Sequence, residues 1–470
     1  MAFYNPFRRR TEHTKETWGY SFDMTPEHPT PEEMHHLKFT YDVLGESCYH
    51  RLNDISPPPD KTLPRNNSLD VKEEEKKAPR DLYFLLRDNA DKDETLAKLW
   101  KQVNTVPEWV DWEQIERGQD VFYRYGGANL TGLAYQSLLG GMGAARVVET
   151  LARTGGFSTK VARRRLYETT QHILQCTRSL ESIKPGGDGW ASTIRVRLLH
   201  SAVRNRILKL AKERPLYYNV EEYGIPINDL DSMATIGTFS ATLIWLALPR
   251  QGIFLRKQEI IDYLALWRYI GHVIGSPTDP FATPSSAQKW MEVLLYYEIK
   301  PSPTSKILAN NIIKSLEGRP PIWASPDMLI ASARWLNGND LCDELGLARP
   351  GYYYWFLMAG QCFFFVVMAY SYRLFPEADK KKVEFLKRAF WTMIVESKSG
   401  LEGNMSGFEF KHVPQFSTLT EMDENEEGKE KVVGIESRNF RWLIFGVSGV
   451  VLGVYCSSKI AGAIWGRVWS

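Results

Sequence analysis

The chain has 470 residues, of which 43% are hydrophobic and 13% aromatic, enough for one large domain or two to three ordinary ones. A formal net charge of +2 gives no general case for nucleic-acid binding, and no basic patch is interleaved with aromatic residues. The 5 cysteines are scattered and odd in number, which excludes a CxxC zinc or redox site and fits a reducing compartment. Residues 1–10 lack the apolar core of a signal peptide, so secretion by the usual route is not expected.

Residues 1–81 are expected to form an N-terminal extension, partly helical and partly disordered. Residues 1–29 are polar and rich in proline, histidine and glutamate, a composition typical of poor order. A helix is expected over residues 30–50, because Thr30 is suited to cap it and is followed by a proline and two acidic residues. Residues 55–81, with three successive prolines and a charged run, predict a long loop.

The main body, residues 82–376, is expected to be all-α, a single large helical domain. Its stretches carry apolar residues at helical spacing, and clean hairpin signals and internal repeats are absent. The glycines at 140–143 have no strand before them and no Lys-Ser/Thr after them, so a loop or close helix packing is favoured over a phosphate site. The strongest helical patterns cover residues 166–180, 194–213, 233–248, 257–274 and 287–297.

Two apolar stretches raise the question of a membrane. Residues 352–370 form a nearly uncharged aromatic run, but their place inside the body favours a buried helix. Residues 377–440 predict a helical and acidic linker, and residues 441–470 a C-terminal membrane anchor, whose apolar part 442–465 reaches spanning length only if Lys459 is included. Basic residues typical of a membrane interface flank it at Arg438, Arg441 and Arg467. A soluble terminal helix is the alternative.

One histidine, His200, lies on the apolar face of a basic helix. At helical spacing Val196 and Leu199 share its side of the helix, while several arginines spread around it. Neutral imidazole is the commonest transition-metal ligand in proteins and a standard axial ligand of haem iron. Guanidinium groups such as those of Arg197 and Arg204 are suited to pairing with haem propionates. From these residues alone, a core histidine satisfied by backbone is the commoner alternative.

Three polar residues upstream are further candidates. Glu149 stands in the stretch 146–157 (RVVETLARTGGF), and Arg165 and Thr169, four residues apart, face the same way on one helix. For each, the usual alternative is a solvated helix face or a hydroxyl bonded back to its own helix. His172, one turn past Thr169, is an alternative metal ligand. No HExxH motif indicates zinc.

Taken together, the motifs of the body resemble one family in their order and spacing. That family is the catalytic domain shared by the ER-bound oxygenases of mycophenolic-acid-type pathways and the bacterial latex-clearing proteins, or rubber oxygenases. The resemblance covers roughly residues 82–375. It rests on 106–112 (VPEWVDW), 154–157 (TGGF), the Arg165/Thr169 pair, 186–190 (GGDGW), 195–200 (RVRLLH), 267–272 (WRYIGH) and 341–348 (LCDELGLA).

The resemblance implies a globin-like helical core that holds haem b, with His200 as the proximal ligand of the iron. It also implies that O2 is used to cleave a carbon–carbon double bond of an apolar isoprenoid into carbonyl fragments. Arg165 and Thr169 fall where the family has residues near the haem, suited to holding a propionate or an oxygen species and to donating a hydrogen bond. Glu149 falls where a glutamate is proposed as a base that removes an allylic proton.

The chain departs from the bacterial relatives at Glu168, where they can carry a lysine that caps the iron. This departure disfavours polyisoprene as the substrate. A cellular, lipid-linked or small terpenoid substrate fits better with an intracellular protein at the endoplasmic-reticulum membrane whose body lies in the cytosol. A soluble cytoplasmic protein is the alternative location.

Three functions remain open at this point. The leading hypothesis is a haem-dependent dioxygenase that uses O2 on an isoprenoid-like alkene. A haem monooxygenase or peroxygenase is the alternative within the same chemistry. A haem-binding or purely helical membrane-tethered protein without turnover is the alternative from another class, with Glu149 and Arg165 as structural ion-pair partners.

Overall fold

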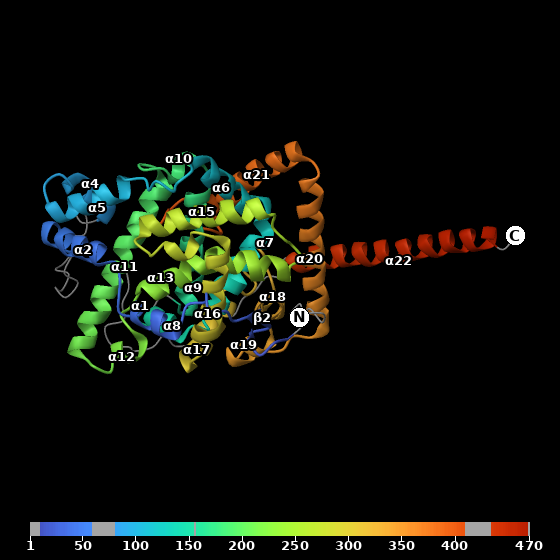
Figure 1. Ribbon diagram of the computed structural model, residues 1–470, viewed down its shortest axis with the longest axis horizontal. Coiled ribbons are helices and arrows are strands. Elements are labelled where there is room, and N and C mark those ends of the chain that lie inside the picture. The colour runs from blue at the N-terminus through green and yellow to red at the C-terminus, as the bar shows by residue number, and fades with distance from the viewer. Residues whose placement is uncertain (1–9, 59–79, 155–156, 409–433, 469–470) are drawn as a thin grey trace.

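The structure is a computed structural model that describes residues 10–58, 80–154, 157–408 and 434–468, with side chains as far as 459 and without that of Lys160. In these residues the chain is almost entirely helical, which confirms the all-α expectation. Figure 1 shows a body of packed helices from which the last helix projects. The first half comprises β1 (Thr14–Thr17), β2 (Tyr20–Asp23), α1 (Pro31–Leu37), α2 (Val43–Ile55), α4 (Leu82–Asn89), α5 (Glu94–Asn104), α6 (Trp112–Arg124), α7 (Gly126–Thr131), the π-helix η1 (Gly132–Leu139), α8 (Ala145–Arg153), α9 (Thr159–Thr177), α10 (Leu180–Ile183) and α11 (Asp188–Glu213). The second half comprises α12 (Val220–Tyr223), α13 (Asp229–Phe239), η2 (Leu243–Ala247), α14 (Leu248–Arg250), α15 (Lys257–Ile274), η3 (Asp279–Phe281), α16 (Pro284–Glu298), α17 (Pro303–Leu316), α18 (Pro326–Asn337), α19 (Asn339–Glu344), α20 (Tyr352–Arg373), α21 (Pro376–Trp391), η4 (Thr392–Glu396) and α22 (Ile435–Val468).

The N-terminal segment is folded against the body from residue 10 onward, although the composition of residues 1–29 suggested poor order. Strands β1 and β2 pair antiparallel through a turn in which Trp18 and Gly19 both have positive φ, 49° and 70°. After the hairpin, Nε2 of His28 donates a 2.9 Å hydrogen bond to the buried carboxylate of Glu292 on α16. The sequence hides this hairpin because tryptophan is not a typical residue for the left-handed region of a turn.

The helix expected over residues 30–50 is in fact two helices. Thr30 caps α1 as predicted, within a capping box. However, α1 ends at Leu37, and α2 begins only after Asp42, whose carboxylate accepts a hydrogen bond from the Gly45 amide at 3.0 Å. Of the two segments expected to be irregular, residues 55–81 lie largely outside the described residues, and the acidic stretch at 421–431 lies wholly outside them.

The strong helical patterns of the body are confirmed in α9, α11, α15 and α16, and α15 has the expected bounds of Lys257–Ile274. The pattern at 233–248 is interrupted, because the backbone of Ser240 leaves the helical region and separates α13 from the π-helical η2. Helix α11 is 26 residues long and runs through the body. Trp190, Ile194 and Leu198 on this helix are fully buried in the larger of the apolar cores.

Two buried ion pairs fasten α2 to α11. The guanidinium of Arg197 donates to both carboxylate oxygens of Asp42, at 2.6 and 2.7 Å. One turn of α2 further on, Arg204 donates to Glu46 at 3.1 Å. Both arginines are almost completely buried, so each would be left as an unpaired charge if its carboxylate were removed.

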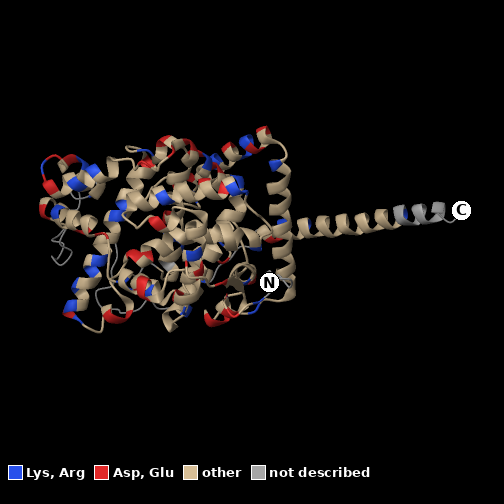
Figure 2. Cartoon of the chain, in the orientation of Figure 1, with Lys and Arg blue, Asp and Glu red and all other residues tan. Residues whose placement is uncertain are grey.

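Three helical stretches are long and apolar enough to cross a membrane by length and composition. Asp229–Arg250 is 67% buried within the protein and belongs to the core. Tyr352–Arg373 is 39% buried, so the burial expected for residues 352–370 holds for one face of α20 only. In Ile435–Lys459, the third stretch, the apolar window of α22 has no buried residue, and Figure 2 shows that almost no charge lies along the projecting helix.

Because Asp42 neutralises a buried guanidinium, we expect Asp42→Asn to lower the free energy of unfolding by about 2–4 kcal/mol. Asparagine keeps the cap of α2, so the loss reports on the ion pair. The control is Glu94→Gln, which breaks the exposed pair between Glu94 and Lys98 and is expected to change stability little. Chemical denaturation of the detergent-solubilised protein measures both variants, and equal losses would contradict the assignment.

Candidate active site

Helices α9 and α11 form an antiparallel hairpin that is closed at one end. There the backbones approach so closely that a Cβ at Gly189 would collide with the carbonyl of Gln175. His172 on α9 makes a 2.9 Å hydrogen bond with the hydroxyl of Ser192 on α11. Cys176 lies against Thr193, and burial raises the pKa of its thiol to about 12. The side chains at this end leave almost no accessible surface.

The other end of the hairpin is less tightly filled. Continuing the antiparallel register from the pair His172–Ser192 places Arg165 opposite His200 and Thr169 opposite Val196. These side chains are only partly buried although both helices lie inside the body, whereas those at the closed end are buried. This register would set three of the residues singled out in the sequence on facing helices, and each of these side chains keeps some accessible surface.

His200 is enclosed by protein but not hydrogen-bonded to it. Burial, with smaller contributions from the charges of Arg204 and His172, lowers the pKa of the imidazole to about 4. The ring is therefore neutral at physiological pH, which is the form that binds a metal. Among the described residues it has no hydrogen-bond partner, although its side chain keeps accessible surface. The satisfied core histidine weighed as the alternative would need such a partner.

Arg165 and Thr169 are also weakly engaged. The closest acidic partner of Arg165 is Glu168 on the same helix, at 4.0 Å, and Glu168 lies nearer to Arg164, at 3.2 Å. The hydroxyl of Thr169 has no partner among the described residues, whereas the neighbouring Thr170 donates to the carbonyl of Leu166 at 2.8 Å. The alternative weighed for Thr169, a hydroxyl bonded back to its own helix, therefore applies to Thr170 and not to Thr169.

Glu149 lies on α8 and is paired. Its carboxylate accepts a hydrogen bond from the guanidinium of Arg153, one turn along the same helix, and both side chains are buried. Arg153 also donates to the carbonyl of Tyr217 at 2.7 Å and lies over the rings of Tyr217 and Tyr218. The two tyrosines belong to the apolar cluster that contains Leu199, the neighbour of His200 in sequence. Glu149 is therefore joined to the tyrosine cluster through Arg153, and only one of its two carboxylate oxygens is engaged in the pair.

Arg197 and Arg204, which the sequence suggested for the haem propionates, have other partners. Their donors are directed to Asp42, Glu46 and carbonyl groups, as described above for the contact of α2 with α11. The sequence shows that these arginines surround His200, but not that a helix 150 residues upstream supplies their carboxylates. The geometry leaves Arg165 as the arginine suited to an external anion.

His172 was the alternative ligand. Its Nδ1 is bonded to Ser192, and the ring stacks edge-on against Phe408, at 5.9 Å between centroids. Phe408 belongs to a segment that follows η4 and is held on α9 by Gln171, which exchanges hydrogen bonds with the backbone of Ser406 at 2.8 and 3.2 Å. Sequence reasoning missed this contact, since residues 377–440 carry only the signals of a linker.

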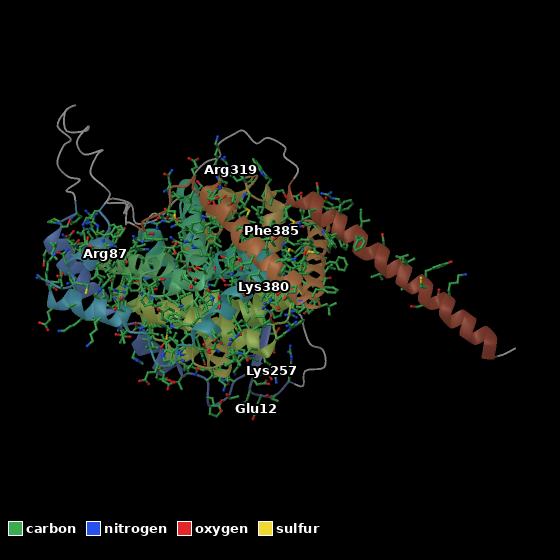
Figure 3. All side chains as sticks on the ribbon, turned by 90° about the horizontal axis from the view of Figure 1, so that it is seen from above. Glu12, Arg87, Lys257, Arg319, Lys380 and Phe385 are labelled. Carbon is green, nitrogen blue, oxygen red and sulfur yellow. The ribbon has the colours of Figure 1, made fainter. Side chains whose placement is uncertain are left out.

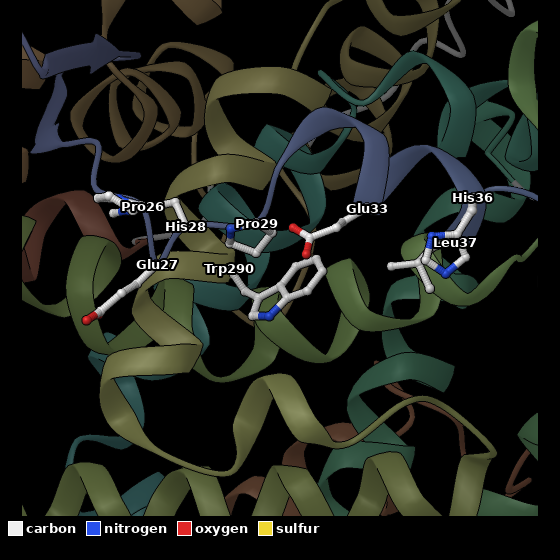
Figure 4. Close-up of a pocket in the computed structure, with 8 residues that line it drawn as sticks. All are labelled: Pro26, Glu27, His28, Pro29, Glu33, His36, Leu37 and Trp290. Carbon is white, nitrogen blue, oxygen red and sulfur yellow. The ribbon is translucent and has the colours of Figure 1, made fainter.

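A surface pocket of about 400 Å³ lies elsewhere, between α1 and α16 (Figure 4). Its lining comes from residues 26–29, 33, 36, 37 and Trp290, and it contains none of the site residues suggested by the sequence. Among the described residues, no group of three or more His, Cys, Asp and Glu side chains is placed to hold a metal ion. A metal at His200 would therefore need most of its ligands from elsewhere, as haem iron has from its macrocycle.

Comparison with known families assigns the chain to a family. Residues 123–363, just over half of the chain, match the family described as "ER-bound oxygenase mpaB/B'/Rubber oxygenase, catalytic domain". The chain belongs to this oxygenase family. The matched residues contain Glu149, Arg165, Thr169 and His200.

The fold has a solved counterpart. It is similar to the "Structure of Latex Clearing Protein LCP in the closed state", with a TM-score of 0.51 and 16% sequence identity, over 75% of this chain and 90% of that chain. At this identity the likeness shows the fold alone. No curated protein matches the chain.

Burial of His172 predicts a loss of stability in acid. Its pKa, about 4 in the folded protein, lies below the ordinary 6.5, so between these values the unfolded chain takes up a proton that the folded protein does not. Stability is complete above pH 6.5 and falls as the pH is lowered to 4. We expect His172→Asn, which can keep the bond to Ser192, to reduce this loss by up to about 3 kcal/mol.

Denaturation curves of the protein without added haem, recorded from pH 7 to pH 4, measure this difference. His35→Asn is the matched control, because His35 is exposed on α1 and its replacement should leave the pH dependence as it is in the wild type. Parallel curves for the wild type and His172→Asn would show that His172 is not the group responsible.

Proposed function

We propose that this protein is a haem b-dependent oxygenase in which His200 is the protein ligand of the iron. The observation that carries the proposal is the neutral, enclosed and unbonded imidazole of His200 opposite Arg165 and Thr169. The three side chains fit the cofactor in kind, since they offer one metal ligand, one cation and one hydroxyl donor. Membership of the oxygenase family supports the same assignment.

Each residue has a role that follows from its position. His200 presents a ring nitrogen from the proximal helix α11, and burial keeps that nitrogen free of a proton at physiological pH. Arg165 on α9 supplies a guanidinium for a propionate or for negative charge that develops on oxygen. Thr169 on the same helix supplies a hydroxyl donor. The haem, when bound, supplies the activation of O2.

Glu149 is the proposed base. One carboxylate oxygen, Oε2, accepts from Arg153 in a buried pair, and an allylic proton would be taken by the other oxygen, Oε1. The rings of Tyr217 and Tyr218 lie against Arg153 and give the pair apolar surroundings. Arg153 is then a positioning residue that holds the carboxylate while its second oxygen acts.

We propose an apolar isoprenoid-like alkene as the substrate, cleaved at a carbon–carbon double bond. Val196 and Leu199, beside His200, give the site apolar walls, and Glu168 is engaged by two arginines of its own helix instead of capping a metal. Hydroxylation by a monooxygenase or peroxygenase is the second candidate, because a histidine-ligated iron does not fix the outcome. Labelled O2 distinguishes them: two labelled atoms shared between paired carbonyl products indicate cleavage, and one indicates hydroxylation.

We further propose that α22 anchors the protein in a membrane, with the body on the cytosolic side of the endoplasmic reticulum. The helix is apolar on all sides and unburied between Arg441 and Lys459. A helix of this kind is typical of a membrane span. Arg438 and Arg441 lie at its base, next to the body, and positive charge favours the cytosolic side.

If His200 holds the haem, His200→Ala should abolish or shift the Soret band of protein purified with an adequate haem supply. His172→Asn is the matched control, and it should retain the band because His172 is bonded to Ser192 at the closed end of the hairpin. Visible absorption spectra test both variants. A wild-type protein that stays colourless after haem reconstitution would refute the proposal. A Soret band lost only in His172→Asn would show that His172 on α9, and not His200, is the ligand.

If Glu149 is the base, Glu149→Gln should lower kcat by at least about 100-fold while leaving the Soret band unchanged. Glutamine keeps the size of the side chain and a hydrogen-bond acceptor for Arg153, so the site should remain intact. Turnover is followed as carbonyl products from a panel of isoprenoid alkenes. Unchanged turnover would show that Glu149 is a structural partner of Arg153 alone.

A further inference from the structure

Helix α22 leaves the body by crossing α20 (Figures 1 and 3). At the crossing the helices are in close contact, because a Cβ at Gly360 would collide with the carbonyl of Asn439. The side chain of Asn439 is buried there and donates to Gln361 at 3.2 Å. Trp442 then packs against Phe364 with tilted rings, at 5.1 Å between centroids. The base of the proposed anchor is thus fixed to α20 by polar and aromatic contacts.

The outer face of α20 is apolar, with its most exposed side chains at the two ends of the helix. Tyr352 and Phe356, at its first turns, are 84% and 58% exposed, and Leu374, directly after its last turn, is 75% exposed. Tyr353 is exposed too and lies beside Phe440 of α22, so the apolar face of α20 continues into that of α22. Tyrosine and other aromatic side chains are enriched where a protein meets the headgroup region of a bilayer.

Helix α20 cannot itself be a span of the same membrane. Its opposite face, with Leu357, Met358 and Phe365, is buried in the body. The helix also lies across the start of α22 instead of beside it, so that when α22 spans a bilayer, α20 lies along the surface of that bilayer (Figure 1). A helix with one apolar face and one packed face suits the plane of the interface.

We infer that the outer face of α20 is a second membrane contact, which lies in the headgroup region of the bilayer that α22 spans. This inference rests on the proposed anchoring by α22. The occupant is a lipid surface because the face is continuous with the apolar surface of the anchor and is rich in aromatic residues. Arg441, exposed at the base of α22, is placed to meet lipid phosphates at the same level. The body then rests on the membrane by one fixed edge.

The full-length chain offers a direct test, because Cys456 on α22 is exposed and the other four cysteines are buried. Bimane attached to Cys456 reports on the anchor. In a Cys456→Ser background, Phe356→Cys carries the label on α20, and Phe84→Cys carries it on α4, at the far end of the body, as the matched control. Each protein is reconstituted into phosphatidylcholine vesicles that contain lipids with a nitroxide either near the headgroup or near the end of the acyl chain.

We expect the label at position 356 to lose more fluorescence with the shallow nitroxide than with the deep one. The label at position 84 should lose fluorescence with neither nitroxide. Loss at Cys456 without loss at position 356 would overturn the inference and leave the anchor in place. Stronger loss at position 356 with the deep nitroxide would overturn it by placing α20 in the acyl region. A label at position 356 that is shielded from water but insensitive to both nitroxides would assign the face to a second copy of the chain. No loss at Cys456 would refute the anchor itself.

Discussion

The site depends on the close approach of α9 and α11 at Gly189. Only a residue without a side chain fits against the carbonyl of Gln175, and this contact fixes the register of the two helices. The bond from His172 to Ser192 then closes that end of the hairpin. Because the register is fixed there, residues two turns along, on each helix, are also placed opposite one another. Continued along both helices, this register would set Arg165 and Thr169 opposite the segment that carries His200.

Burial divides the polar residues of this region into two kinds. Arg197 and Arg204 have carboxylate partners from α2, and their contacts hold the N-terminal helices against the body. His200 and Thr169 have no hydrogen-bond partner among the described residues, and Arg165 has only a distant one. A polar group inside a protein costs free energy unless a partner satisfies it, so groups left unsatisfied together are expected where a ligand completes them. The presence or absence of a protein partner, and not the residue type, therefore distinguishes the structural arginines from the candidate site residues.

The sequence predicted the all-α class, the bounds of α15 and the cap of α1 at Thr30. Those features depend on helical spacing and local caps, which can be read from neighbouring residues. It did not predict the partners of Arg197 and Arg204, the pairing of Glu149 with Arg153, or the contact of Phe408 with His172. Spacing shows which face a side chain occupies, but the partner in each of these cases depends on how the helices or loops pack. The hairpin at Trp18 was missed for a local reason, since its turn residue is atypical.

Helix α20 connects the membrane-facing edge to the interior of the body. Leu357, Met358 and Cys362 on this helix belong to the apolar core that includes α8 and α9, whereas Phe365 and Ala369 belong to the core that includes α11. Close-packed cores move little as units, so the position of α20 on a bilayer also fixes the position of the hairpin that carries the site. An alkene that partitions into lipid is concentrated along the edge that α20 would occupy. For such a substrate, the same helix that orients the body would bring the site to the phase where the substrate is dissolved.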